Sequence, residues 1–426
     1  MTRLAILADD YTGMLDTAAQ FARQGIRALC TADLSLPLSG RGAQVLAFDL
    51  ECRHCGPAAA YDTAYALCAR LRAADTPLLY LKTDSCLRGN IGPLFSAALD
   101  VFGGERIGFA PAWPENGRVT KNGVHYVDGA PARESAAGRD LLDPVSIDRV
   151  TELLAAQGCP GARSLRVGEA PQAGDGSRVL VADAETRREL LTAGELFRQA
   201  GVCRLLAGCG GFASVLPALL PFRRDKAEPP PMGNRLLLVS GTGNANTLRQ
   251  LDMAAALGFR RVFAAPERLA FHPGEIVNEI APRLREALAE SPRVLLSTAY
   301  TAGDAEDFLR ACRRERYGVA AAGRRVVEAL AELVSAVFPA REPPCLCIFG
   351  GDTLHALMER LGCETVEPVR EVAPGVPVSV ARRGGGAIPV ISKSGGFGGS
   401  GVLHAICDFL DRENGGGPAP STKPSR

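Results

Sequence analysis

The stretch from Cys345 to Gly362 constrains the fold of this 426-residue chain more than any other segment. Cys345 to Phe349 is a short apolar run, which predicts a buried strand. Gly350 and Gly351 then permit a turn that residues with a Cβ would resist, and an Asp-Thr pair supplies preferred N-cap residues. Apolar residues follow at the spacing of one helix face, and a glycine ends the helix. This order of strand, glycine turn and capped helix is typical of an α/β sheet.

The turn at Gly350 also suggests chemistry. Backbone N–H groups at a helix N-terminus favour an anion, so the turn is predicted to lie beside a phosphate. A carboxylate there would not bind phosphate itself, and Asp352 is expected either to hold Mg²⁺ or to take a proton from an attacking hydroxyl. The alternative is a capped strand–helix junction with no function, and this segment alone leaves both interpretations open.

Length and composition indicate a soluble protein of two or three domains. A net charge of +1 gives no reason to expect nucleic acid or a membrane as the main partner. The 13 cysteines are scattered and most of them lie in apolar runs, which indicates reduced, buried thiols of a cytoplasmic protein. Asp9 and Asp10 come too early in the chain for the apolar segment of a signal peptide. No apolar run of roughly 18 residues occurs that would predict a membrane-spanning helix.

The first predicted strand, Leu4 to Leu7, runs into Asp9 and Asp10 and then a helix. Polar residues between a strand and a helix mark the usual ligand position of doubly wound sheets. Adjacent carboxylates repel each other unless a cation or a hydroxyl-rich ligand lies between them. The alternative is that one aspartate caps the helix and the other is solvated.

Two further strands end in charged loops. Val45 to Phe48 leads to Arg53, a candidate carboxylate clamp, within a Cys-Arg-His-Cys cluster that lacks a second pair at zinc-ligand spacing. Leu78 to Leu81 leads to a loop that combines cations, a carboxylate and hydroxyls, as a polyol acid requires, although a polar surface loop is the alternative. Its candidate ligand-binding residues are Lys82, Thr83, Asp84, Ser85 and Arg88.

The segment 111–129 predicts a long functional loop with a hairpin, because Asn122-Gly123 and Asp128-Gly129 are turn dipeptides. His125 within it fits either a ligand-binding or acid role or a plain hairpin side chain.

Charged and proline-rich residues at 222–233 predict a linker between an N-terminal domain at 1–221 and a C-terminal domain at 234–413, followed by a disordered tail at 414–426. In the second half, glycine-rich turns follow strands near Ser240, Gly350 and Lys393. If these strand ends share one sheet edge, they form a nucleotide cleft. The chain has neither a Walker P-loop nor a full dinucleotide-binding glycine motif.

Several motifs along the chain match those of one protein family. The chain resembles the four-carbon acid sugar kinases, which include D-threonate, D-erythronate and 3-oxo-tetronate 4-kinases. The matching stretches span nearly the whole chain in family order: ADDYTGMLDTAAQFARQG (8–25), ECRH (51–54), KTDSCLRGNIG (82–92), PAWPENGRVTKNGVHYVDGAP (111–131), VADAET (181–186), GGDT (350–353) and ISKSGGFG (391–398).

The resemblance implies two α/β domains, each with a mainly parallel sheet flanked by helices. The N-terminal domain would bind the sugar acid, the C-terminal domain would bind ATP, and the active site would lie in the interdomain cleft. The implied acid-binding residues are Asp9, Asp10, Arg53, Lys82, Thr83, Asp84, Ser85 and Arg88. The implied ATP-binding residues are Ser240, Gly350, Gly351, Asp352, Thr353, Gly395 and Gly396.

The expected activity is a cytoplasmic, ATP- and Mg²⁺-dependent phosphorylation of the C4 hydroxyl, with Asp352, Asp84 or Asp10 as the catalytic carboxylate and no metal ligand assigned. The turn after Ser240, and Cys86 and Tyr11 within the acid-binding motifs, depart from the family pattern. The alternatives are a nicotinamide-dependent hydroxy-acid oxidoreductase and a sugar-acid-binding protein without catalysis. The sequence leaves the choice of four-carbon acid open, and also whether the protein is a homodimer.

Overall fold

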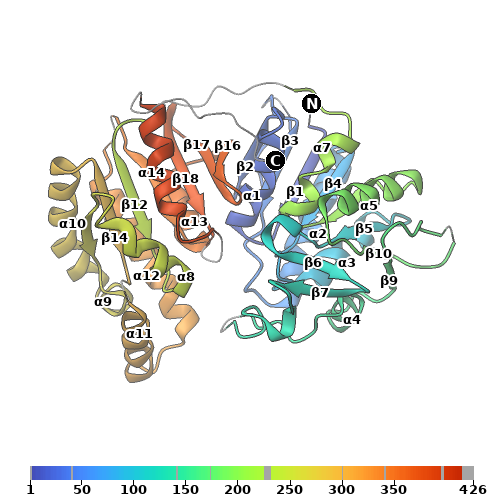
Figure 1. The fold of residues 1–426 in the computed structure, drawn as a ribbon, viewed down its shortest axis with the longest axis horizontal. Helices are drawn as coiled ribbons and strands as arrows, with labels where there is room; N and C mark the ends of the chain where they lie inside the picture. Colours follow the sequence, from blue (N-terminus) through green and yellow to red (C-terminus); the bar gives the residue numbers. More distant parts are fainter. Residues whose placement is uncertain are drawn as a thin grey trace, which may run out of the picture. The chain divides into compact units, whose positions relative to one another are not determined.

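The structure of the protein is a computed structural model that describes residues 2–39, 42–140, 143–172, 174–224, 232–299, 301–339, 342–394 and 398–414. The chain divides into two compact units, Met1–Ala227 with Thr365–Val369, and Glu228–Glu364 with Arg370–Arg426. Each unit has a mainly parallel sheet with helices beside it (Figure 1), which confirms the expected α/β fold. Residues 225–231 of the expected linker and 415–426 of the expected tail lie outside the described residues.

The sheet of the first unit has the order β16-β2-β3-β1-β4-β11-β5-β10-β9. Neighbouring strands are parallel except β16, which runs antiparallel to β2 and joins this unit through Thr365–Val369. The strands are β1 Leu4–Ala8, β2 Ala28–Thr31, β3 Val45–Asp49, β4 Leu78–Lys82, β5 Ile107–Ala110, β9 Ala162–Leu165, β10 Val179–Ala182, β11 Leu205–Gly208 and β16 Thr365–Ala373.

Helices of the first unit lie between and after these strands, and several of them form the crossovers that join parallel neighbours. They are α1 Tyr11–Ala22, α2 Pro57–Ala73, α3 Ile91–Val101, α4 Val150–Ala156, α5 Arg187–Gln199, α6 Gly210–Ala213 and α7 Leu216–Leu219, with short 3₁₀ turns η1 Pro114–Asn116 and η2 Ala132–Glu134. The central strands are fully buried, as their apolar sequences require, and the rings of Phe95 and Phe109 meet edge to face between α3 and β5.

A small antiparallel sheet forms from the segment predicted as a hairpin. Its strands are β6 Arg118–Lys121, β7 Val124–Val127 and β8 Ala130–Pro131. The turns fall at the two predicted dipeptides, where Asn122, Gly123, Asp128 and Gly129 all have positive φ. These residue types accept that conformation most readily, so the sequence fixes the places of both turns.

The second unit has the strand order β13-β14-β12-β15-β18-β17-β16. The pairs from β13 to β18 are parallel, and β17 runs antiparallel to β18. The remaining elements are β12 Leu236–Ser240, α8 Ala245–Leu251, η3 Asp252–Ala254, β13 Arg260–Phe263, α9 Pro266–Phe271, α10 Pro273–Glu290, β14 Arg293–Ser297, α11 Ala302–Arg314, α12 Val319–Val337, β15 Cys345–Phe349, α13 Gly351–Arg360, β17 Val376–Arg383, β18 Gly386–Lys393 and α14 Val402–Glu413. Across the described part of the chain, no helix has the length and apolarity needed to cross a membrane.

Candidate active site

Three parallel strands of the first unit end at one edge of its sheet. Ala8 at the end of β1 lies in register with Asp49 at the end of β3 and with Lys82 at the end of β4. Ligands of open α/β sheets bind outside such carboxyl ends. The segments that follow these strand ends are residues 9–13, 50–55 and 83–90.

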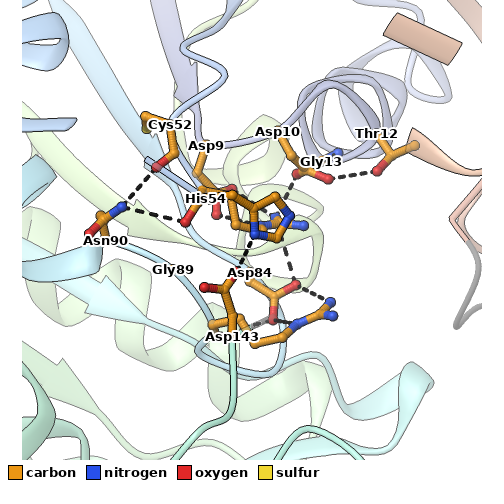
Figure 2. A network of polar contacts seen from close by, with 12 residues as sticks. Asp9, Asp10, Thr12, Gly13, Cys52, His54, Asp84, Gly89, Asn90 and Asp143 are labelled. Atoms are coloured by element: carbon orange, nitrogen blue, oxygen red, sulfur yellow. Dashed lines mark hydrogen bonds and ion pairs between the residues drawn. The ribbon is translucent and has the colours of Figure 1, made fainter. Parts of the chain in front are cut away.

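The side chains of Asp9, Asp10 and Asp84 gather at this edge (Figure 2). The Arg53 guanidinium joins these aspartates. Its Nε donates to Oδ2 of Asp9 at 2.8 Å, and its Nη2 donates to Oδ1 of Asp9 at 2.9 Å. The same Nη2 donates to Oδ1 of Asp10 at 2.6 Å and lies 3.7 Å from Oδ1 of Asp84. Arg53 is therefore the cation that relieves the repulsion between the adjacent carboxylates.

Asp84 is held by a second arginine in the same loop. Nε and Nη2 of Arg88 donate to the two oxygens of Asp84, each at 2.9 Å, and the backbone N–H of Cys86 donates to Oδ2. Nη1 of Arg88 also donates to Oδ2 of Asp140 at 3.0 Å. A bidentate arginine–carboxylate pair is among the most directional contacts in proteins, so the orientation of Asp84 is fixed.

The three carboxylates differ in their electrostatics. Burial raises the pKa of Asp9, and the charge of Asp10 adds to this rise. Burial acts in the same direction on Asp10, but the charges of Arg53 and Lys82 outweigh it and lower the pKa of Asp10. Arg88 and Arg53 likewise overcome burial and hold the pKa of Asp84 well below its usual range. Carboxylates with lowered pKa values remain charged and are weak proton acceptors.

Lys82 brings a second kind of cation to this edge. Its side chain is 2% exposed, yet its ammonium forms no hydrogen bond or ion pair with the residues that the structure describes. Although burial favours the neutral amine, the charges of Asp16, Asp10 and Asp9 raise its pKa. A Cβ at Gly13 would lie 2.3 Å from Nζ of Lys82 and 2.3 Å from Oδ1 of Asp10. The missing side chain of Gly13 thus leaves room for a charged ammonium whose donors are free for a ligand.

The loop after β4 is held from behind by the hairpin. Nε2 of His125 lies 2.9 Å from the carbonyl oxygen of Ser85, and Nδ1 lies 3.1 Å from Oγ1 of Thr120. Burial lowers the pKa of His125 to about 4, so the ring is neutral and its Nε2–H donates to Ser85. His125 is fully buried and acts as a hairpin side chain that holds the loop. The hydroxyl of Thr83 is buried without a partner among the described residues.

We expect His125→Gln to weaken the dependence of stability on pH. Folding lowers the pKa of His125 from 6.5 to about 4, so the folded state binds fewer protons than the unfolded state between these values. The resulting stability, roughly 3 kcal/mol, is present above pH 6.5 and lost as the pH falls toward 4. Urea unfolding at pH 7 and 4.5 measures this loss, with exposed His272→Gln as the control. Equal losses in His125→Gln and wild type would contradict a neutral buried ring.

In the second unit, the three strand ends with polar turns also share one edge. Ser240 at the end of β12 lies in register with Phe349 at the end of β15, and Phe349 lies in register with Lys393 at the end of β18. The sequence predicts glycine-rich turns after these three strands, and the alignment of the three strand ends on one edge is confirmed. The hydroxyl of Ser240 is buried and has no partner within the described residues.

The turn that opens α13 depends on its glycine. Gly350 has a φ of 120°, which side chains disfavour, and its N–H donates to the carbonyl oxygen of Lys393 at 3.0 Å. Thr353 is buried in the first turn of α13, where a Cβ at Gly241 would lie 2.3 Å from its Oγ1. The turns after β12 and β15 are thus in close contact. The predicted ATP-binding residues Gly395 and Gly396 lie outside the described residues.

Asp352 is exposed in the first turn of α13. Among the described residues, no group of three or more His, Cys, Asp or Glu side chains is arranged to hold a metal ion. Mg²⁺ in phosphoryl-transfer sites usually takes one or two carboxylates, phosphate oxygens and waters rather than a cage of protein ligands. A single exposed carboxylate beside a glycine turn is a donor set that fits Mg²⁺ bound together with a nucleotide.

Two protein-family models match this chain, one over each of the two units that carry the sheet edges described above. A family model described as a sugar-binding N-terminal domain matches residues 4–216, and one described as a nucleotide-binding C-terminal domain matches residues 237–403. A D-threonate kinase from Cupriavidus necator is 31% identical over 424 residues, which cover 94% of this chain and 96% of that relative. The chain belongs to the four-carbon acid sugar kinase family.

Other members of this kinase family match equally long stretches. A D-threonate kinase from Salmonella typhimurium is 28% identical and a D-erythronate kinase from Heliobacterium modesticaldum is 26% identical, each across 96% of this chain and 97% of the relative. A crystal structure from Salmonella typhimurium LT2 has a TM-score of 0.78 at 23% identity, covering 95% of this chain and 99% of that chain. One from Haemophilus influenzae has a TM-score of 0.67 at 20% identity, covering 96% and 99%. These two structures confirm the fold.

At these two sheet edges, Gly13 and Lys393 are residues for which the sequence analysis predicted no role. Gly13 lies in the first turn of α1, although glycine is a poor helix former. A glycine at such a position indicates that other side chains approach the helix backbone closely, as those of Lys82 and Asp10 do here. Lys393 ends a strand that is mostly apolar, and a charge there indicates a role beyond packing. The sequence also did not show that Arg53 and Arg88 bind the aspartates of the same site.

Proposed function

We propose that this protein transfers the γ-phosphoryl group of ATP to the C4 hydroxyl of a four-carbon sugar acid, either threonate, erythronate or 3-oxo-tetronate. The observation that carries the proposal is the first-unit edge, where the buried ammonium of Lys82 has unused donors beside the carboxylates of Asp9 and Asp10. A small polyol acid has the complementary groups, a carboxylate for the cation and hydroxyls for the carboxylates. The names of the relatives agree with this chemistry.

The acid-binding residues divide into two groups in this proposal. Lys82 binds the substrate carboxylate, because its donors are not used by the described chain. Asp9, Asp10 and Asp84 accept hydrogen bonds from substrate hydroxyls, and Thr83 and Ser85 add hydroxyl groups. Arg53 and Arg88 hold these carboxylates charged and oriented, and Nη1 of Arg53, which has no hydrogen bond to the described residues, is left for the ligand.

The nucleotide is proposed to bind at the second-unit edge. The turn at Gly350 and Gly351 lets a phosphate approach the start of α13, where the helix dipole favours an anion. Ser240 and Thr353 offer hydroxyls beside that turn. Gly395 and Gly396 belong to this proposal through the family resemblance alone.

Catalysis then needs positioning and charge neutralisation more than covalent chemistry. Asp352 is proposed either to accept the proton of the C4 hydroxyl or to hold Mg²⁺ with the nucleotide phosphates. Bound Mg²⁺ would neutralise the charge on the transferred group. Asp10 and Asp84 are weaker candidates for the base, because ion pairs lower their pKa values. Since the reaction consumes ATP, we expect it to take place in the cytoplasm.

A coupled assay of ADP release with a panel of acids tests the proposal. We expect turnover with D-threonate, D-erythronate or a 3-oxo-tetronate, and little with the shorter D-glycerate or the longer D-gluconate. The product should carry its phosphate on C4, which phosphorus–proton NMR coupling identifies. An ADP release that no four-carbon acid stimulates would refute the proposal.

Thermal shift separates the alternatives. Under the proposal, both ATP with Mg²⁺ and a four-carbon acid raise the melting temperature, because each binds the folded state. A shift with NAD and none with ATP would favour the oxidoreductase. Shifts with the acid alone, and no turnover, would favour a binding protein without catalysis.

A further inference from the structure

The side chain of Lys393 crosses the end of a neighbouring strand. Lys393 ends β18 and is 1% exposed. Its Nζ lies 4.7 Å from the ring centroid of Phe349 on β15 and 3.4 Å from Oγ1 of Thr247 in α8, the helix that follows β12. Because the strand order is β12-β15-β18, the side chain reaches from β18 over the end of β15 to the element beyond it. The ammonium therefore lies in the row of polar strand ends.

The contacts that hold this ammonium include two neutral oxygens and an aromatic ring. Nζ donates to Oγ1 of Thr247 and to the carbonyl oxygen of Ser394 at 2.9 Å, and the face of the Phe349 ring adds a cation–π contact. Burial disfavours the charged form of an amine, and it lowers the pKa of Lys393 to about 8. An ionisable group kept in such a position is typical of a functional site.

The backbone of the same residue supports the glycine turn. The carbonyl oxygen of Lys393 accepts from the N–H of Gly350, so the turn that opens α13 begins next to this lysine. On the other side, Nε2 of Gln250 in α8 donates to the carbonyl oxygen of Gly398 at 2.8 Å. A ligand outside these strand ends would lie beside the ammonium, the glycine turn and α8 together.

We propose that the Lys393 ammonium provides the positive charge that binds the phosphates of a nucleoside di- or triphosphate at this edge. This inference rests on the proposed ATP-dependent function. An anion beside Nζ stabilises the charged ammonium, which burial disfavours. The opposing interpretation is purely structural, with Lys393 tying the end of β18 to α8 through Thr247.

Calorimetry with ADP and with adenosine separates these interpretations, because the two ligands differ only in their phosphates. We expect Lys393→Met to weaken ADP binding roughly 10–100-fold, as the loss of a charged contact should, and to change adenosine binding less than about twofold. Thr247→Val is the matched control: it removes the tie to α8 and keeps the charge, so ADP binding should stay close to wild type.

Several outcomes would overturn the inference. ADP binding that survives Lys393→Met would remove the lysine from the phosphate site. Equal losses of ADP and adenosine, or the same losses in Thr247→Val, would assign Lys393 to structure alone. If wild type itself binds neither ADP nor ATP, the proposed function fails, and that result needs no variant.

A measurement on wild type keeps the test open if Lys393→Met does not fold. In protein labelled with ¹³C at lysine Cε, the amine that titrates near pH 8 should shift to a higher pKa with ADP and stay unchanged with adenosine. Cys347 on β15 is the titratable neighbour of Lys393, and burial raises the pKa of its thiol well above the usual value, so the thiol remains neutral over this range. A pKa that ADP leaves unchanged would refute phosphate binding.

Discussion

Asp352→Asn is expected to lower kcat roughly 10²–10⁴-fold, the usual contribution of a positioned base or metal ligand. Nucleotide binding should persist, because Gly350 and the buried Thr353 keep the turn that opens α13. Steady-state kinetics and calorimetry with ADP measure the two effects separately. Glu359→Gln is the matched control, since it neutralises another exposed carboxylate of the same helix.

The response to Mg²⁺ distinguishes the two roles of Asp352. If the carboxylate holds the metal, the variant should regain part of its activity at higher Mg²⁺ concentration, because a lost ligand weakens metal binding. If the carboxylate is the base, activity should remain low at every Mg²⁺ concentration. Turnover close to wild type would exclude Asp352 from the mechanism and move the role to Asp10 or Asp84.

The strand–turn–helix order was predictable because it depends on local sequence. The apolar run at Cys345–Phe349 and the acid pair at Asp9 and Asp10 both mark strands that end at a sheet edge, and the structure has β15 and β1 there. The hairpin turns were predictable for the same reason, since Asn-Gly and Asp-Gly specify positive φ. Local patterns of this kind need no knowledge of distant partners.

The structural features that sequence patterns did not predict depend on contacts between residues far apart in the chain. Arg53 and Asp9 are 44 positions apart, so their ion pair follows from the register of β1 with β3 rather than from any motif. The strand β16 was not predicted, and its start pairs with β2, where Arg27 binds the buried Glu367 at 2.6 Å. The β-branched residues of this segment and the Pro374-Gly375 turn that bounds it were the available signal.

Arg53→Ala is expected to raise the KM for the sugar acid strongly and to leave the KM for ATP nearly unchanged. The variant removes the guanidinium that binds Asp9 and Asp10, both of which lie at the proposed acid-binding edge. Loss of such a buried charge contact should cost on the order of 2–5 kcal/mol of acid binding. Kinetics with each substrate varied at a saturating concentration of the other test this division. A selective loss of ATP binding would refute the assignment of the acid to the first unit.

The same variant should lower the free energy of unfolding, because it leaves the buried carboxylate of Asp9 and the partly buried carboxylate of Asp10 without their shared cation. Breaking a buried pair in this way costs about 3–5 kcal/mol. Arg178→Ala provides the control, since its ion pair with Asp100 is nearly half exposed and should contribute at most about 1 kcal/mol. Arg53→Lys keeps the charge but loses the bidentate geometry, so it should lie between wild type and Arg53→Ala.

The pH dependence separates lost binding from lost folding in Arg53→Ala. The charge of Arg53 opposes protonation of both Asp9 and Asp10, so its removal raises both pKa values. Ionised carboxylates accept hydrogen bonds from substrate hydroxyls, and protonated ones do so less well. As the pH falls, acid binding by the variant should therefore begin to weaken at a higher pH than acid binding by wild type. A variant whose acid binding is reduced by the same factor at every pH would show that Arg53 contacts the acid itself rather than acting through the aspartates.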